Sequence, residues 1–293
     1  MTDPNPAERI FAPAREEAKI AKEQTSSPQT EDPAYRLAFQ DMDFLLREDL
    51  RPVRFQLELM KPEVLLDEAN IASTLVIYGS ARIPEPAKAD ELLAAASTDS
   101  QRKIAERLKA KSKYYDEARK LARIASQVQP DSDGRKQFVV CSGGGPSIME
   151  AANRGAADEG RDSIGLNIVL QHEQMPNQYV TPGLSFQFHY FSLRKMHFLI
   201  RARAVAVFPG GFGTFDECFE LLTLIQTGKI KPLPIVLFGR EFWSNAVNFD
   251  YLADEGTINR VDLDLFKFVE TAEEAWEYIS DYYSAEDRGD DGS

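Results

Sequence analysis

From about residue 71 onward, the apolar residues of the chain follow two alternating periodicities. Short, continuously apolar runs predict buried strands at 73–78, 138–142, 163–169, 185–188, 204–208, 234–238 and 265–268. Between these runs, apolar residues recur at helical spacing and predict helices at 104–128, 147–159, 192–201, 212–227 and 242–252, and from 272 onward. This alternation is typical of a parallel sheet covered by helices on both faces. We therefore predict an α/β, Rossmann-like fold with a doubly wound parallel sheet.

The segments outside this alternation differ in character. Residues 1–33 are polar and proline-rich, which predicts a flexible N-terminal arm with one helical turn near 14–22. Apolar residues at helical spacing predict a helical extension over 34–70, packed on the edge of the main domain. The main domain is expected at 71–285, with a charged insertion at 84–101. An acidic, disordered tail is expected at 286–293.

Composition narrows the class of protein. The chain has 293 residues, and its 34 Lys and Arg against 47 Asp and Glu give a net charge of −13. Nucleic acid is therefore not an expected partner, because it needs a basic surface. No apolar run has the roughly 18 residues of a membrane span, and the N-terminus has no signal-peptide core. Two cysteines and three dispersed histidines predict neither a disulfide framework nor a metal site, so we expect a soluble, cytoplasmic protein.

Three predicted strands end in turns rich in glycine or serine. These turns are Gly79-Ser80, Gly143-Gly144-Gly145 and the longer loop from Gly210 to Thr214. Such a turn before a helix lets backbone N–H groups approach a phosphate, although each turn alone is also explained by tight strand-to-helix geometry. Three turns at one sheet edge favour a nucleotide or sugar-phosphate ligand. The sequence contains no P-loop motif, and neither longer glycine loop matches the dinucleotide fingerprint.

Charged residues near the third loop add candidate chemistry. Thr214 and Glu217 have the spacing of a helix capping box, in which Glu217 would bond to the backbone of Thr214. Alternatively, Glu217 acts on a bound sugar as a general base or as an anion that stabilises positive charge. Arg194 and Lys195 precede the loop, and Arg194 is suited to holding a phosphate or orienting a carboxylate. Between Gln174 and Phe215 the sequence contains no Asp or Glu.

The motifs together resemble a known family. Residues 209–217 read PGGFGTFDE and match PGGxGTxxE, the signature of the LOG ("lonely guy") nucleoside 5′-monophosphate phosphoribohydrolases, long labelled lysine decarboxylases. The Arg194-Lys195 pair matches the second signature of the family, and Gly143 to Met149 resembles its GGG-x-x-x-M turn. Residues 79–82 resemble its first nucleotide-contacting turn, and the resemblance spans roughly 73–285.

The resemblance implies a function and a set of site residues. The implied reaction is hydrolysis of the N-glycosidic bond of AMP or an N6-modified AMP to free base and ribose 5-phosphate, without a metal or organic cofactor. Glu217 and Arg194 would be the catalytic pair, and Gly210, Gly211, Gly213 and Thr214 would hold the phosphate. The remaining nucleotide contacts would come from Gly79, Ser80, Arg82, Gly143, Gly144, Gly145, Met149 and Lys195. Family members form homodimers or larger assemblies, so a homo-oligomer is expected.

Two other functions would make different demands on the sequence. A non-catalytic carrier of a nucleotide-containing cofactor such as the molybdenum cofactor would need the glycine turns but not the Arg194–Glu217 pair. A pyridoxal-phosphate decarboxylase would need a pyridine-ring partner, and none is evident beside Lys195. After Gly145 this chain has residues 146–150, PSIME, where many relatives of the family carry additional glycines around the Met, which leaves the shape of the base pocket open. Because the N-terminal extension and the insertion are absent from the shortest relatives, ordinary AMP is at least as good a substrate candidate as a plant-hormone precursor.

Overall fold

The computed structural model describes residues 11–171 and 175–290, so parts of the predicted arm and tail, at 1–10 and 291–293, lie outside the described residues. The chain divides into two compact units, Met1–Glu58 and Leu59–Ser293. The boundary falls inside the helix α4 (Arg51–Glu68), which the sequence assigned as a whole to a helical extension. We describe the two units separately.

The first unit is built from short helical segments. The predicted helical turn near 14–22 is confirmed as α1 (Ala14–Ile20), which is followed directly by a short 3₁₀ turn. The other segments before α4 are η2 (Ala21–Glu23), α2 (Pro28–Glu31), η3 (Pro33–Tyr35), η4 (Ala38–Gln40), α3 (Met42–Leu45) and η5 (Glu48–Leu50). Side chains of Ser27, Asp32 and Asp41 cap three of these segments by accepting bonds from backbone N–H groups.

The second unit contains a sheet of seven strands, all parallel, in the order β4-β3-β2-β1-β5-β6-β7. The strands are β1 (Thr74–Tyr78), β2 (Val139–Ser142), β3 (Ser163–Ile168), β4 (Ser185–Phe188), β5 (Ala202–Val207), β6 (Ile235–Phe238) and β7 (Lys267–Val269). Strands β2, β3 and β4 follow one another on one side of β1, and strands β5, β6 and β7 follow one another on its other side. The predicted doubly wound parallel sheet is therefore confirmed, with its topological switch point between β1 and β5.

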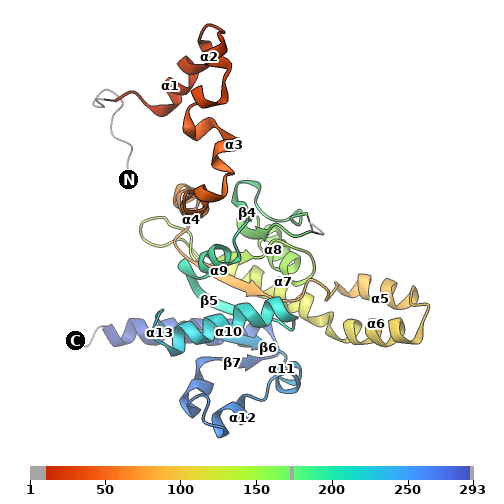
Figure 1. Cartoon of the computed structure of the whole chain (residues 1–293). Coiled ribbons are helices and arrows are strands. Elements are labelled where there is room, and N and C mark those ends of the chain that lie inside the picture. Colours follow the sequence, from red (N-terminus) through yellow and green to blue (C-terminus); the bar gives the residue numbers. More distant parts are fainter. Residues whose placement is uncertain (1–10, 172–174, 291–293) are drawn as a thin grey trace. The chain divides into compact units, whose positions relative to one another are not determined.

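Helices cover both faces of this sheet (Figure 1). On one face α7 (Lys113–Ser126), α8 (Ile148–Asp158) and α13 (Ala272–Asp290) pack on the fully buried Leu75, Ile77 and Val140. On the other face lie α9 (Phe191–Ile200) and α10 (Phe212–Gln226), where the ring of Phe198 meets the ring of Tyr78 edge-on at 5.0 Å. Strands buried from both sides explain the continuous apolar runs in the sequence.

Several predicted boundaries were wrong. The single helix expected at 104–128 is two helices, α6 (Asp99–Lys111) and α7, because the Ser112 hydroxyl bonds to the carbonyl of Lys109 where the chain turns. The insertion at 84–101 contains a further helix, α5 (Pro86–Ala94). The helix expected at 242–252 is split into α11 (Arg240–Ala246) and α12 (Phe249–Asp254), since Val247 is extended and Asn248 caps a new helix.

The C-terminal region also differs from the prediction. Helix α13 continues to Asp290 and so includes residues 286–290 of the tail that was expected to be disordered. Extending an existing helix costs much less than starting one, which explains how a polar segment can remain helical. The remaining short segments are η6 (Pro182–Leu184) before β4 and η7 (Arg260–Leu265) before β7.

Candidate active site

The three glycine-containing turns meet at the carboxyl edge of the sheet. They follow β1, β2 and β5, which are neighbours in the strand order. The Ser80 N–H donates to the carbonyl of Pro209 at 3.2 Å and thereby links the first turn to the third. The Ile148 N–H, at the start of α8, donates to the carbonyl of Ser80 at 3.4 Å. The predicted turns therefore surround the switch point, where ligands bind in folds of this type.

Arg194 and Glu217 form a buried ion pair at this edge. Arg194 Nη1 lies 3.1 Å from Glu217 Oε1, and the two side chains are 10% and 13% exposed. The two residues come from different helices, α9 and α10, and are 23 residues apart in the chain. The structure thus brings together the two residues that the family resemblance implied as a catalytic pair.

Two further contacts fix the Arg194 guanidinium. Its Nε donates to the carbonyl of Leu166 in β3 at 2.6 Å, and its Cζ lies 5.0 Å from the ring centre of Phe198. These contacts, together with Glu217, hold the side chain from three directions. A charged guanidinium of this kind is expensive to bury unless it is paired and hydrogen-bonded, so the surrounding groups determine its position.

Burial raises the pKa of Glu217 to about 7, while the neighbouring Arg194 acts in the opposite direction. The desolvation of the carboxylate is therefore only partly offset by its ion pair. A carboxyl group with a pKa near neutral pH can both accept and return a proton under physiological conditions. This electrostatic environment matches what a general base requires.

The second turn needs its glycines for close packing around Arg194. A Cβ at Gly143 would lie 2.7 Å from Arg194 Nη2 and 2.7 Å from Met149 Sδ. A Cβ at Gly144, whose φ is +71°, would lie 2.6 Å from the Asn167 side chain. The structure therefore places Gly143 and Met149 beside Arg194, and Gly144 beside Asn167.

Polar side chains that the sequence did not single out, the buried Ser142 and Asn153 and the half-buried Asn177, support this turn. Ser142 Oγ donates to Asn153 Oδ1 at 2.7 Å and accepts from the Gly144 N–H at 3.0 Å. Asn177 Nδ2 lies 2.9 Å from the carbonyl of Gly145 and 2.9 Å from Asn153 Oδ1. These residues give no motif signal, because the contacts join segments up to 33 residues apart.

Helix α10 begins at the third turn without a side-chain cap. Its N-cap residue is Gly211, and Glu217 bonds to Arg194 rather than to the helix backbone, so the capping-box alternative is wrong. A Cβ at Gly210 would lie 2.1 Å from Thr214 Oγ1, whereas positions 211 and 213 face open space. Gly211 and Gly213 are thus exposed at the N-terminus of a 15-residue helix, where the backbone favours anions.

Two predicted contacts lie away from the ion pair. Lys195 Nζ pairs with Glu220 Oε2 at 2.8 Å and with Asp216 Oδ2 at 3.2 Å on α10. The bond to Glu220 raises the pKa of Lys195, so its amine stays protonated. Arg82 is exposed, and only its backbone N–H is used locally, in a bond to Ser80 Oγ. Among the described residues neither cation is paired with Glu217, although the charge of Lys195 also acts to lower the pKa of that carboxyl.

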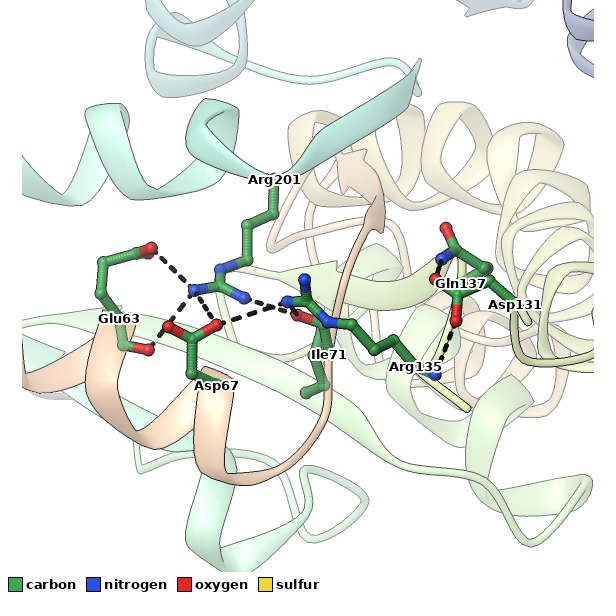
Figure 2. Close-up of polar contacts among 7 residues, drawn as sticks. All are labelled: Glu63, Asp67, Ile71, Asp131, Arg135, Gln137 and Arg201. Atoms are coloured by element: carbon green, nitrogen blue, oxygen red, sulfur yellow. Dashed lines mark hydrogen bonds and ion pairs between the residues drawn. The ribbon is translucent and has the colours of Figure 1, made fainter. Parts of the chain in front are cut away.

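The far end of α9 is anchored at the opposite, amino edge of the sheet (Figure 2). Arg201 Nη2 pairs with Glu63 Oε2 at 2.8 Å and with Asp67 Oδ1 at 3.0 Å, and Nη1 donates to the carbonyl of Ile71. Arg135 shares both Asp67 and the Ile71 carbonyl with Arg201. These contacts fix the axis of the helix that carries Arg194.

The described residues show neither a membrane-spanning helix nor a metal-binding cluster. None of the helices there combines the length and hydropathy needed to cross a membrane. In the same part of the chain, no group of three or more His, Cys, Asp or Glu side chains could hold a metal ion. A cavity at the amino edge is lined in part by Lys136, Arg161 and Asp162, and it shares no residue with the predicted site.

Comparisons with known proteins place this geometry in context. Residues 149–279 match a family model described as possible lysine decarboxylase. Among solved structures, the X-ray structure of TM1055 is 20% identical with a TM-score of 0.44 and covers 71% of this chain and 99% of its own. The Moco carrier protein from Chlamydomonas reinhardtii is 15% identical with a TM-score of 0.43 and covers 73% of this chain and 98% of its own.

The fold and the carboxyl-edge turns define a Rossmann-like α/β protein with a candidate anion site at its switch point. Two curated relatives from Arabidopsis thaliana are named cytokinin riboside 5′-monophosphate phosphoribohydrolases. LOG3 is 25% identical over 154 residues, covering 51% of this chain and 70% of its own length. LOG2 is 26% identical over 153 residues, covering 51% and 67%. The resemblance to the LOG family, predicted from the motifs, is confirmed by these matches.

Proposed function

We propose that this protein hydrolyses the N-glycosidic bond of a nucleoside 5′-monophosphate, AMP or an N6-modified AMP, to give the free base and ribose 5-phosphate. The observation that carries the proposal is the buried Arg194–Glu217 pair beside the uncapped N-terminus of α10. The pair supplies a carboxylate for the glycosidic bond, and the helix N-terminus supplies an anion site for the phosphate at the same sheet edge.

The phosphate subsite is supported by the two exposed glycines of the third turn. Neither Gly211 nor Gly213 is required by packing, since a Cβ at either position would meet no atom within 4 Å. Gly213 lies inside α10, where glycine costs about 0.5–1 kcal/mol relative to alanine. The open space beside Gly211 and Gly213 lets an oxyanion approach the backbone N–H groups of the helix N-terminus closely.

The catalytic chemistry follows from the position of Glu217. It lies one turn beyond Thr214 on α10, about 5 Å further along the helix axis. In the proposed step, water attacks C1′ of the ribose and transfers a proton to Glu217 while the bond from C1′ to the base nitrogen breaks. The bonding electrons leave with the base, which then takes up a proton. The negative charge of Glu217 also stabilises the oxocarbenium-like transition state.

Arg194 has two roles in this proposal. It keeps part of the Glu217 population ionised by opposing the effect of burial on the pKa. It also fixes the carboxylate in one orientation, because its guanidinium is itself held by Leu166 and Phe198. A pre-oriented carboxylate lowers the entropic part of the barrier.

A lysine decarboxylase reaction through pyridoxal phosphate is disfavoured by the state of Lys195. A Schiff-base lysine must lose its proton before it can attack a carbonyl. Lys195 instead has a raised pKa because of its bond to Glu220, and it forms a second ion pair with Asp216. The names of the two Arabidopsis relatives support the phosphoribohydrolase reaction instead.

The substrate comparison that tests this proposal uses AMP and adenosine. Purified protein is incubated with each compound, and free adenine is quantified by chromatography. We expect adenine from AMP and at least about 100-fold less from adenosine, since two or more lost phosphate bonds are worth about 3 kcal/mol. Equal rates with both compounds would contradict the proposal that a subsite binds the phosphate. Tight AMP binding without adenine release would instead indicate the carrier function.

A further inference from the structure

Tyr78 is a buried tyrosine on the face of the sheet that carries the Arg194–Glu217 pair. It is the last residue of β1 and is 3% exposed. Its ring meets the ring of Phe198 edge-on, and the guanidinium of Arg194 lies over the same Phe198 ring. Arg194 and Phe198 are one turn apart on α9 and therefore share one side of this helix. Tyr78 thus lies in the layer between the sheet and the two helices of the candidate site.

The backbone of Tyr78 is fixed at the switch point of the sheet. Its partner in β5 is Val207, and the Phe208 N–H donates to its carbonyl at 2.8 Å. The next residue, Gly79, begins the first of the three turns. The side chain of Tyr78 therefore starts from a rigid position at the place where the three turns meet.

The hydroxyl group of Tyr78 bonds to no other described residue. Its oxygen is not completely enclosed either, so a water molecule can reach it. The buried Tyr115 differs in this respect, because its hydroxyl donates to Glu150 Oε1 at 2.9 Å. Buried hydroxyl groups in proteins are usually hydrogen-bonded, and ordered water supplies the partner where side chains do not.

One oxygen of Glu217 is in the same situation. Arg194 bonds to Oε1 at 3.1 Å, whereas Oε2 has no hydrogen-bond partner among the described residues. Oε2 is not completely enclosed, so water can reach it as well. The carboxylate of Glu217 thus has an unused acceptor, and the hydroxyl of Tyr78 has an unused donor.

Electrostatic effects connect the two groups. Burial raises the pKa of Tyr78 well above its ordinary value, the charge of Glu217 raises it further, and Arg194 opposes both effects. The hydroxyl therefore stays protonated near neutral pH and can donate a hydrogen bond. The other titratable and charged groups that act on Glu217 or Tyr78 come from β2, α9 and α10: Cys141, Arg194, Lys195, Asp216 and Glu220. In the part of the chain that the structure describes, only Arg194 bonds directly to Glu217, so a further donor would stabilise the ionised carboxylate.

We propose that Tyr78 is a positioning residue for Glu217: its hydroxyl donates to a water molecule, and this water donates to Oε2 of the carboxylate. This role rests on the proposed function, since Tyr78 acts in the same site. A water-mediated bond is nearly as favourable in enthalpy as a direct one. With Arg194 on Oε1 and the water on Oε2, both oxygens of the base are held and its ionised form is stabilised.

The first test compares the pH profiles of Tyr78→Phe and Tyr114→Phe in the full-length protein. Tyr114 is the matched control, because it is 6% exposed, lies in α7 on the other face of the sheet, and its hydroxyl also bonds to no described residue. Loss of the Tyr78 hydroxyl should move the acid limb of kcat/KM for AMP to higher pH by about one pH unit. The rate of Tyr78→Phe should then be about tenfold lower at pH 6 and within about twofold of the wild type at pH 9. A loss that is uniform at all pH values, or an acid limb that does not move, overturns the proposal.

The second test does not depend on hydrolysis. The carboxyl carbon of Glu217 is followed by ¹³C NMR during a pH titration of glutamate-labelled protein, and its signal is assigned by its absence from Glu217→Gln. We expect a midpoint near pH 7 in the wild type and in Tyr114→Phe, and a midpoint about one pH unit higher in Tyr78→Phe. An equal midpoint in Tyr78→Phe overturns the role of Tyr78 even if the protein hydrolyses AMP. A shifted midpoint in a protein that releases no adenine would support the contact with Glu217 and contradict the proposed function.

Discussion

Glu217 is a carboxyl group that the fold has largely removed from water without fully compensating its charge. Its ion pair with Arg194 opposes the effect of burial, yet its pKa remains at about 7 rather than 4.5. A group whose pKa lies near the working pH exists in both protonation states and exchanges protons readily. The proposed catalytic role therefore has a direct pH signature.

The pH dependence of kcat/KM reports this group in the free enzyme. Because the ionised form is the active base and the pKa is raised, activity with AMP should be lost as the pH falls below about 7 and level off above it. We expect about a tenfold decrease per pH unit on the acid side. Steady-state rates between pH 5 and 9 measure the profile, with circular dichroism at each pH to verify folding. A profile that is flat between pH 5 and 8 would contradict the role.

Gly143 provides a steric test of the position of Arg194. In Gly143→Ala the new Cβ would be 2.7 Å from Arg194 Nη2, so the guanidinium must shift. A displacement of this size should lower kcat by about 100-fold. Gly183→Ala is the matched control, since Gly183 has no atom within 4 Å of its Cβ position. Equal rates for the two variants would show that Arg194 need not occupy its observed position.

The elements that carry the site are α9 and α10, which lie on the same face of the sheet (Figure 1). Helix α9 positions Arg194 at one end and is anchored through Arg201 at the other (Figure 2). Helix α10 presents its free N-terminus and, one turn further on, Glu217. The site thus depends on the packing of two helices, each beginning at the carboxyl edge of a strand.

A substitution in the first turn of α10 should raise the stability of the fold and weaken the binding of AMP. Gly213→Ala introduces no clash and replaces glycine in a helix, so it should stabilise the fold by about 0.5–1 kcal/mol. The same methyl group occupies the proposed phosphate space and should raise KM for AMP about tenfold, or about 1.4 kcal/mol. Thermal unfolding and steady-state kinetics measure the two effects. An unchanged KM would place the phosphate elsewhere.

The sequence predicted the elements of the sheet better than the helices around it. Apolar runs located the strands because both faces of the sheet are buried, as at Leu75 and Val76. The break at Val247 depends on one extended residue, and the break at Ser112, whose backbone is helical, coincides with a local bond to Lys109. Neither leaves a trace in the apolar periodicity. In the site, motifs identified Arg194 and Glu217, whereas Asn153 and Asn177 act through contacts that only the folded chain creates.

In the second unit as a whole, three arginines from one stretch without acidic residues lie at different places on the sheet. Between Gln174 and Phe215 the sequence has no Asp or Glu, and it left open whether Arg201 and Arg203 face the same pocket as Arg194. The structure places these arginines in different surroundings. Arg194 lies at the carboxyl edge, while Arg201 pairs with Glu63 and Arg203 stacks on Tyr283, 4.0 Å from its ring centre. Arg201 and Arg203 thus form contacts that stabilise the fold, away from the proposed ligand site.

The most direct measurement of the proposed function separates binding from turnover in Glu217→Gln. Calorimetric titration gives the AMP affinity, and chromatography gives the rate of adenine release, with Glu220→Gln as the control on the same helix. We expect Glu217→Gln to bind AMP within a few-fold of the wild type and to release adenine about 10²–10⁴-fold more slowly, the usual contribution of a general base. A wild type that binds AMP without releasing adenine, or a Glu217→Gln variant of undiminished rate, would contradict the proposal.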